Sequence, residues 1–259
     1  MNKVKLIWLS SLVATLLLGG CGKKETETKE EAETGTAEAP TPIDQSTVGE
    51  ITGKISFQGD KPKLAVIHMD QDSVCVSKHS SPVTVEDGAV NDNGTLPNVF
   101  VYVKGGAEKY SFPVPSDPVT LDQNGCAYKP HVLGMMAGQT LHVISSDPTT
   151  HNIHPQPKDN QEWNMSQAPG AAPIDKKFAR PEVMVPVKCN QHPWMKAYIG
   201  VVKNPFFAVT GSDGTFTLKG LPPGEYTIGA WTATFGTQEQ KVTIGPKESK
   251  TVDFAFKAS

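Results

Sequence analysis

The chain has 259 residues, of which 37% are hydrophobic and 20% are charged, a composition that excludes a collagen, a coiled coil and a wholly disordered chain. Its 23 Gly and 21 Pro are spread along the sequence, which favours a turn-rich β protein over a helical bundle. The formal net charge is −3, and no segment forms the basic stripe that phosphate contacts require, so no nucleic-acid partner is expected.

Residues 1–20 have the pattern of an export signal peptide. Two lysines within Met1–Lys5 precede an apolar run from Leu6 to Leu18, which is shorter than the roughly 20 residues that a membrane-spanning helix needs. Residues 18–21, Leu-Gly-Gly-Cys, resemble the bacterial lipobox. This resemblance implies that Cys21 is acylated and anchors an exported lipoprotein in the periplasm, at the outer membrane or at the outer face of the cell membrane. The alternative is an ordinary signal peptide followed by a chance cysteine.

Residues 21–47 form a separate, acidic segment. They consist mainly of Lys, Glu, Thr, Ala and Pro and contain almost no large apolar side chain. Such a segment buries too little surface to offset the entropy lost on ordering. We therefore expect a disordered tether between the anchor and the folded part.

From residue 48 onward, apolar residues alternate with polar or small ones in short runs that turn residues separate. This pattern is typical of β-strands, and no segment shows sustained helical periodicity. The sequence therefore predicts an all-β, sandwich-like protein. Strands are expected near residues 51–57, 99–103, 140–144, 183–187, 197–202, 215–218, 226–230 and 252–256.

The C-terminal part contains a recognisable hairpin. Asp213-Gly214 supplies turn residues that tolerate positive φ, and residues 213–228 fit the pattern DGxFxLxGLPPGxYxI. This pattern resembles the carboxypeptidase regulatory-like family, which implies a small transthyretin-like β-sandwich. The strand with which that family begins resembles Gly49–Ile55, far upstream. We therefore predict a discontinuous outer domain, 48–110 and 204–259, with a second domain, 111–203, inserted into it.

The predicted insert contains the residues that carry chemistry. Cys189, His192 and Met195 follow the spacing C-x2-H-x2-M on a loop between two predicted strands. A thiolate, an imidazole and a thioether are the ligand types of a mononuclear electron-transfer copper site, which needs one more imidazole. His151, in the loop after the predicted strand 140–144, offers it.

The region Tyr128–Val202 resembles a cupredoxin of the plastocyanin and amicyanin type, through residues 137–140, 146–152 and 189–195. The resemblance implies a Greek-key β-sandwich and one type 1 copper ion, with His151, Cys189 and His192 as strong ligands and Met195 as the weak axial one. It further implies that Asn152 ties the two ligand loops together and that Pro193 and Trp194 surround the ligands. The implied function is one-electron transfer, not catalysis, with a redox protein such as a cytochrome c or an oxidoreductase as partner.

Several alternatives stay open at this point. His154 rather than His151 could face the metal, and zinc suits thiolate and imidazole ligands, although structural zinc sites rarely use Met. The protein could sequester or deliver copper without transferring electrons, or act as a copper enzyme if Met195 is not bound. A metal-free module could instead bind carbohydrate or envelope polymer through Trp163, Trp194 and Trp231.

Two further cysteines have no place in this ligand set. Cys75 and Cys126 are expected to form a disulfide, because spare thiols outside the cytoplasm usually pair. The alternative is a second metal site, for zinc or Cu(I), in which His79 and His131 join the two cysteines.

Overall fold

A computed structural model describes residues 41–258 of the chain. The signal peptide 1–20, the acylation site Cys21 and most of the tether predicted at 21–47 lie outside the described residues. The described residues belong to one compact unit. Among the described residues, no helix is long and apolar enough to cross a membrane.

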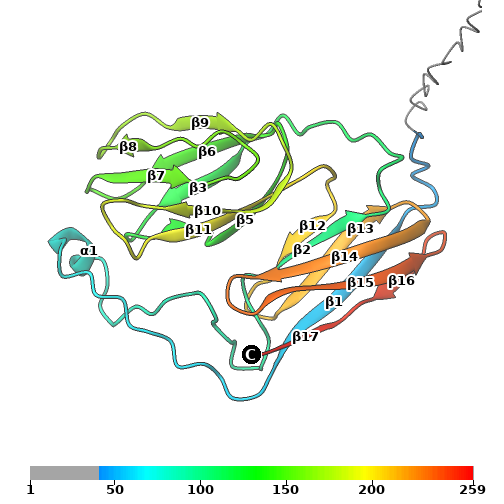
Figure 1. The fold of residues 1–259 in the computed structure, drawn as a ribbon, viewed down its shortest axis with the longest axis horizontal. Helices are drawn as coiled ribbons and strands as arrows, with labels where there is room; N and C mark the ends of the chain where they lie inside the picture. Colours follow the sequence, from blue (N-terminus) through cyan, green and yellow to red (C-terminus); the bar gives the residue numbers. More distant parts are fainter. Residues whose placement is uncertain (1–40, 259) are drawn as a thin grey trace, which may run out of the picture. The chain divides into compact units, whose positions relative to one another are not determined.

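The described part is all-β, as predicted, and consists of two β-sandwiches with one short helix, α1 (Ser73–Ser77) (Figure 1). The outer sandwich has one sheet of β13 (Thr215–Leu221), β1 (Gly49–Gln58), β16 (Ser249–Thr251) and β17 (Phe254–Lys257), and a second sheet of β12 (Phe207–Val209), β2 (Phe100–Gly105), β14 (Gly224–Thr232) and β15 (Gly236–Ile244). The inner sandwich has one sheet of β5 (Val132–Met136), β11 (Lys196–Val202), β10 (Glu182–Lys188), β7 (His151–Pro155) and β8 (Met165–Gln167), and a second of β4 (Tyr128–Lys129), β3 (Val119–Gln123), β6 (Thr140–Ser145) and β9 (Ile174–Lys177).

The outer sandwich is discontinuous in sequence. Its first strand, β1, pairs antiparallel with β13, so that Ile51 lies opposite Leu218. Ile51 and Ile55 are fully buried, while the residues between them are half-buried or exposed, which is the alternation expected of a strand with one face on a core. All strands of the inner sandwich lie between β2 and β12 in the sequence.

One predicted boundary needs correction. The sequence predicts that all of residues 48–110 belong to the outer sandwich. In the structure, Met69 and Cys75 belong to the core of the inner sandwich, and Ile67 and Val83 pack against that core. This segment has apolar side chains and a cysteine that the inner sandwich buries. We call residues 65–85 the cap.

The two sandwiches share a small apolar cluster. Phe100 on β2 is fully buried, and its ring lies so close to Gly200 on β11 that a Cβ added there would be 2.4 Å from the ring. Gly200 therefore allows the aromatic ring to approach the sheet of the inner sandwich closely. The cluster consists of Phe100, Tyr102, Val132, Met184 and Val202.

Candidate metal centre

Three of the predicted ligands lie on a strand and on a loop that follows the neighbouring strand of the same sheet. His151 is the first residue of β7, and Cys189 directly follows β10, which pairs antiparallel with β7. His192 lies in the loop between β10 and β11. Backbone hydrogen bonds from the N–H of Cys189 to the Met195 carbonyl (3.3 Å), and from the N–H of Met195 to the His192 carbonyl (2.9 Å), hold this loop compact.

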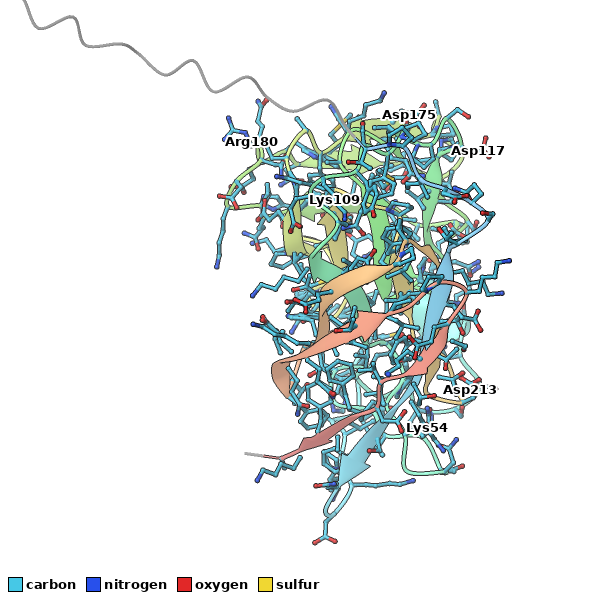
Figure 2. All side chains as sticks on the ribbon, turned by 90° about the vertical axis from the view of Figure 1, so that its right-hand side faces the viewer. Lys54, Lys109, Asp117, Asp175, Arg180 and Asp213 are labelled. Carbon is cyan, nitrogen blue, oxygen red and sulfur yellow. A yellow bond between two sulfur atoms is a disulfide. The ribbon has the colours of Figure 1, made fainter. Side chains whose placement is uncertain are left out.

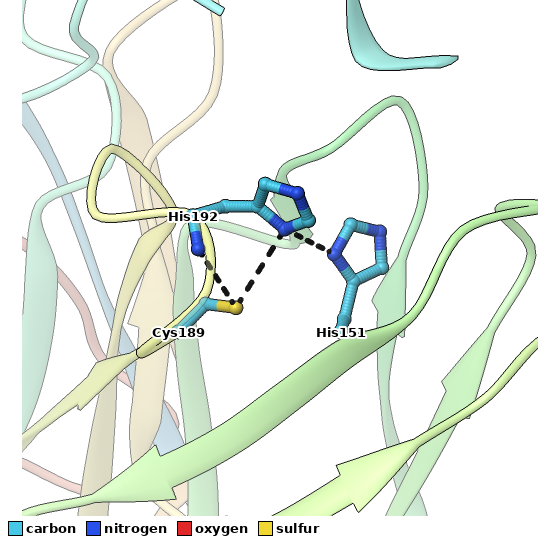
Figure 3. A group of neighbouring side chains, drawn as sticks. All are labelled: His151, Cys189 and His192. Atoms are coloured by element: carbon cyan, nitrogen blue, oxygen red, sulfur yellow. Dashed lines mark hydrogen bonds between the residues drawn. The ribbon is translucent and has the colours of Figure 1, made fainter. Parts of the chain in front are cut away.

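The ligand atoms of these three residues converge. Nδ1 of His151 lies 2.8 Å from Nδ1 of His192, and Sγ of Cys189 lies 3.8 Å from that same His192 atom (Figure 3). All three ligand atoms lie within 4.8 Å of one another, and all three residues are buried. The backbone N–H of His192 donates a hydrogen bond to Cys189 Sγ at 3.4 Å.

Each imidazole uses its other nitrogen to contact a carboxylate. His151 Nε2 lies 3.0 Å from an oxygen of Asp147, and His192 Nε2 lies 3.0 Å from an oxygen of Asp72. A proton on Nε2 leaves the lone pair of Nδ1 available, and carboxylate–histidine contacts of this kind orient metal-ligating imidazoles. Sequence reasoning missed both aspartates. Asp147 precedes His151 by four residues, a signal that could have suggested it, whereas Asp72 is 120 residues from His192.

The environment favours a neutral His151 and ionised aspartates. Burial lowers the pKa of His151 below its usual value, and the neighbouring His192 lowers it further, against the opposing effect of Asp147. Burial by itself would raise the pKa of Asp147, but hydrogen bonds from Cys126, Gly125 and His151 lower it overall. Burial of Asp72 is likewise outweighed, by hydrogen bonds from Thr149, His192 and the backbone, so its pKa is also lowered.

Asn152 links the two ligand loops. Its side-chain oxygen accepts hydrogen bonds from the backbone N–H of Asn190 (2.6 Å) and of Gln191 (3.3 Å), and it lies 3.3 Å from Cys189 Sγ. The hydroxyl of Tyr128 donates to the carbonyls of Asn152 (2.5 Å) and Lys188 (3.0 Å), one on each ligand strand. Burial raises the pKa of Tyr128, which keeps this donor protonated. Tyr128 is a supporting residue that the sequence analysis did not single out.

The remaining predicted residues occupy different positions around the cluster. Met195 is buried in the same apolar core as Cys189, next to Pro193 and Trp194 in sequence. The ring centroids of Trp194 and His192 lie 5.0 Å apart, and the indole N–H of Trp194 donates to the Cys126 carbonyl at 3.1 Å. Pro193 is exposed.

His154, the alternative ligand, lies outside the cluster. Its Nδ1 contacts the side-chain oxygen of Asn190 at 3.1 Å, and its Nε2 contacts Glu162. Neither nitrogen faces Cys189 or His192. Of the two histidines in this segment, the structure therefore brings His151 to the other ligands.

Cys75 and Cys126 are joined in a disulfide, and both are fully buried. The alternative second metal site is not assembled among the described residues, because the bond occupies both sulfur atoms. His79 Nε2 contacts the Gly125 carbonyl, and His131 lies between Asp87 and the Lys196 carbonyl.

The three tryptophans considered for carbohydrate binding do not form an exposed platform. Trp163 and Trp194 pack against the core of the inner sandwich, and Trp231 packs against the cluster shared by the two sandwiches. Each is only partly accessible.

The cluster fits a metal ion in both chemistry and position. Metal–nitrogen bonds of about 2.0 Å and metal–sulfur bonds of about 2.3 Å place the ligand atoms of one ion roughly 3–4 Å apart, as the sulfur and the His192 nitrogen are. Two Nδ1 lone pairs cannot approach to 2.8 Å without a proton between them. A bound cation would take the place of that proton, with a small separation of the two rings.

A family model, the carboxypeptidase regulatory-like domain, matches residues 193–257, about a quarter of the chain. Comparison with curated protein sequences found no match. Similar solved structures include a Cu-containing nitrite reductase from Thermus scotoductus SA-01, with 19% identity and a TM-score of 0.32 over 38% of this chain and 26% of that one. They also include a purple cupredoxin from Nitrosopumilus maritimus, with 17% identity and a TM-score of 0.28 over 32% of this chain and 98% of that one. A mutant of amicyanin with Cu(I) shows 16% identity and a TM-score of 0.26 over 39% of this chain and 97% of that one. The chain thus spans about a quarter of the length of the nitrite reductase.

Proposed function

We propose that this protein binds one copper ion through His151, Cys189 and His192, with Met195 as a weak axial ligand, and exchanges single electrons with a redox protein. The convergence of one thiol and two imidazole nitrogens within 4.8 Å, in a buried site, carries the proposal. Soft sulfur ligands suit Cu(I) and imidazoles also accept Cu(II), so one ligand set serves both oxidation states.

The surrounding residues support such a role by holding the ligands still. Asn152 ties the β7 side of the site to the β10–β11 loop, and Tyr128 bonds to both ligand strands. Asp72 and Asp147 fix the two imidazoles through their Nε2 atoms. A ligand set whose geometry changes little between the Cu(I) and Cu(II) states needs little reorganisation, and this favours rapid electron exchange.

A second candidate function is copper holding or delivery without electron transfer. The observation that favours it is the closure of the site: His192 is only 5% exposed, and the cap covers it through Asp72. The rate of electron self-exchange between Cu(I)- and Cu(II)-loaded protein separates the two candidates. Rapid exchange supports electron transfer, whereas slow exchange with tight binding supports a holding role.

Titration of the full chain with Cu(II), followed by visible absorption, tests the copper site. We expect an intense thiolate-to-copper band that saturates at one equivalent and disappears in the variants Cys189→Ser and His151→Gln. The matched control is His154→Gln, which removes the other histidine of the same strand and should leave the band intact. A band that depends on His154, or the absence of any band, contradicts the proposed ligand set. Preference for zinc over copper in a competition experiment contradicts the choice of metal.

We further propose that the protein is an exported lipoprotein, anchored to the membrane through Cys21 and facing a redox partner in the periplasm. The support is the residue pattern of 1–21, which resembles a signal peptide with a lipobox. Cys21→Ser should abolish incorporation of a labelled fatty acid and release the protein from the membrane fraction. If Cys21→Ser remains membrane-bound, another segment provides the attachment.

A further inference from the structure

The cap contacts the metal centre through one side chain that belongs to no predicted ligand set. Asp72 is the N-cap of α1, and one of its oxygens accepts hydrogen bonds from the backbone N–H of Val74 (2.8 Å) and Cys75 (3.4 Å). Its other oxygen lies 3.0 Å from His192 Nε2 and accepts a hydrogen bond from the Thr149 hydroxyl at 2.8 Å. The carboxylate is therefore held by four donors, only one of which belongs to the metal site.

Asp147 serves His151 in the same way. Its two oxygens accept hydrogen bonds from the backbone N–H groups of Gly125 (2.8 Å) and Cys126 (2.7 Å), and one of them also faces His151 Nε2. The side chain of Asp147 is fully buried, and Lys78, at the end of α1, places its ammonium 3.4 Å from it. The cap thus contains one of the two carboxylates, Asp72, and contacts the other, Asp147, through Lys78.

The disulfide joins these two arrangements covalently. Cys75 is the residue whose N–H bonds to Asp72, and Cys126 is the residue whose N–H bonds to Asp147. The disulfide therefore constrains the distance between Asp72 and Asp147, the carboxylates that contact the two imidazoles.

The disulfide adds a covalent link between the cap and the inner sandwich to the polar contacts of Asp72 and Lys78. A helix of five residues is not stable in isolation, and few cap side chains reach the inner core. Cys75 and Cys126 are both 0% exposed, so both sulfur atoms are shielded from solvent in the folded protein.

From this geometry we infer that Asp72 is a positioning residue for His192, and that the Cys75–Cys126 disulfide holds it in place as a clamp that slows the release of the metal ion. The inference rests on the proposed copper site. Asp72 fixes the Nε2-protonated form of His192 and directs its Nδ1 lone pair to the metal. Loss of a partner of this kind typically lowers metal affinity 10- to 100-fold.

The isosteric variant Asp72→Asn isolates this contact. Asn caps helices as well as Asp does, so its oxygen can still accept from the α1 backbone, but its amide group then presents a donor to the Nε2–H of His192. Asp72→Ser is a second variant that keeps a capping oxygen and lacks the second acceptor. The matched control is Asp175→Asn, because Asp175, labelled in Figure 2, is exposed and contacts His142 at 2.7 Å and not a residue of the cluster.

The experiment loads the full chain with Cu(II) and measures the rate at which an excess chelator removes the metal. We expect release to be 10- to 100-fold faster in both Asp72 variants and in the double variant Cys75→Ala/Cys126→Ala, and unchanged in Asp175→Asn. In zinc-loaded wild-type protein, ¹⁵N-correlated NMR should show a His192 Nε2–H protected from solvent exchange, which a merely structural role of Asp72 does not require. That signal should be lost in Asp72→Asn.

Normal copper binding with unchanged release rates and an unchanged His192 signal would overturn the clamp while leaving the proposed function intact. Faster release in the Asp72 variants but not in the double cysteine variant would overturn the role of the disulfide alone. A wild-type chain that binds no copper would overturn the proposed function and with it the retention role.

Discussion

Removal of the Cys75–Cys126 disulfide should destabilise the metal-free protein by an amount that follows from chain length. The two cysteines are 51 residues apart, so the cross-link closes a long loop in the unfolded chain. The loop-entropy relation gives a loss of about 4 kcal/mol for a loop of this size at 25 °C. This is a large fraction of the roughly 5–15 kcal/mol that separates folded from unfolded states of typical domains.

Urea unfolding of the metal-free full chain, compared between wild type and Cys75→Ala/Cys126→Ala, measures this effect. Alanine is preferable to serine because both positions are fully buried, and a hydroxyl there would add the cost of an unpaired polar group. The transition midpoint should fall, and the slope should rise slightly, because an unfolded chain without the cross-link exposes more surface. Peptide mapping without reductant establishes that the wild-type bond is intact. With that bond shown, a loss below about 1 kcal/mol would refute the loop-entropy argument.

Two further predictions concern the rest of the fold. Burial would lower the pKa of His131, but its 2.8 Å contact with Asp87, together with the charge of Glu86 and the contact with the Lys196 carbonyl, outweighs burial and raises the pKa above the usual 6.5. The stabilisation from protonated His131 is therefore complete below pH 6.5 and lost as pH rises through the raised pKa, so the melting temperature of wild type should fall relative to His131→Gln in that range. A difference that stays constant with pH would contradict this assignment. Gly200→Ala would place a Cβ 2.4 Å from the buried Phe100 ring and should lower the free energy of unfolding in urea by about 1–3 kcal/mol. The control Gly211→Ala meets no atom within 4 Å and should not destabilise the protein. Equal effects of the two substitutions would contradict close packing of Phe100 against Gly200.

The cluster of His151, Cys189 and His192 could be predicted from sequence because most of its signal is local. Cys189, His192 and Met195 lie within one short loop, and the spacing of thiol, imidazole and thioether is itself the signal. The prediction of His151 needed a second loop, which the predicted strand 140–144 and the resemblance over residues 146–152 supplied. Strands with alternating burial, such as β1 and β13, were found for the same reason, since one buried face imposes a period of two.

The parts that sequence did not predict depend on contacts between distant segments. β5 is buried along its whole length, and β15 is mostly exposed, so neither shows alternation. The contact between Asp72 and His192 spans 120 residues, and no local pattern links the two. Asp is a common N-cap residue, but that property does not indicate what its carboxylate faces.

The position of the cap in the sequence connects the outer sandwich to the candidate metal centre. The cap lies between β1 and β2, two strands of the outer sandwich, so both of its ends are anchored there. Its neck is closed by antiparallel backbone contacts, including the bridge between Val66 and Thr84, while its middle is bonded to the inner sandwich through Cys75 and Asp72. An inner sandwich without the flanking strands would keep His151, Cys189 and His192 but would lose the group that orients one of the imidazoles. The insertion of one sandwich into the other therefore has a chemical consequence, because a segment between two strands of the outer sandwich carries the residue that contacts His192.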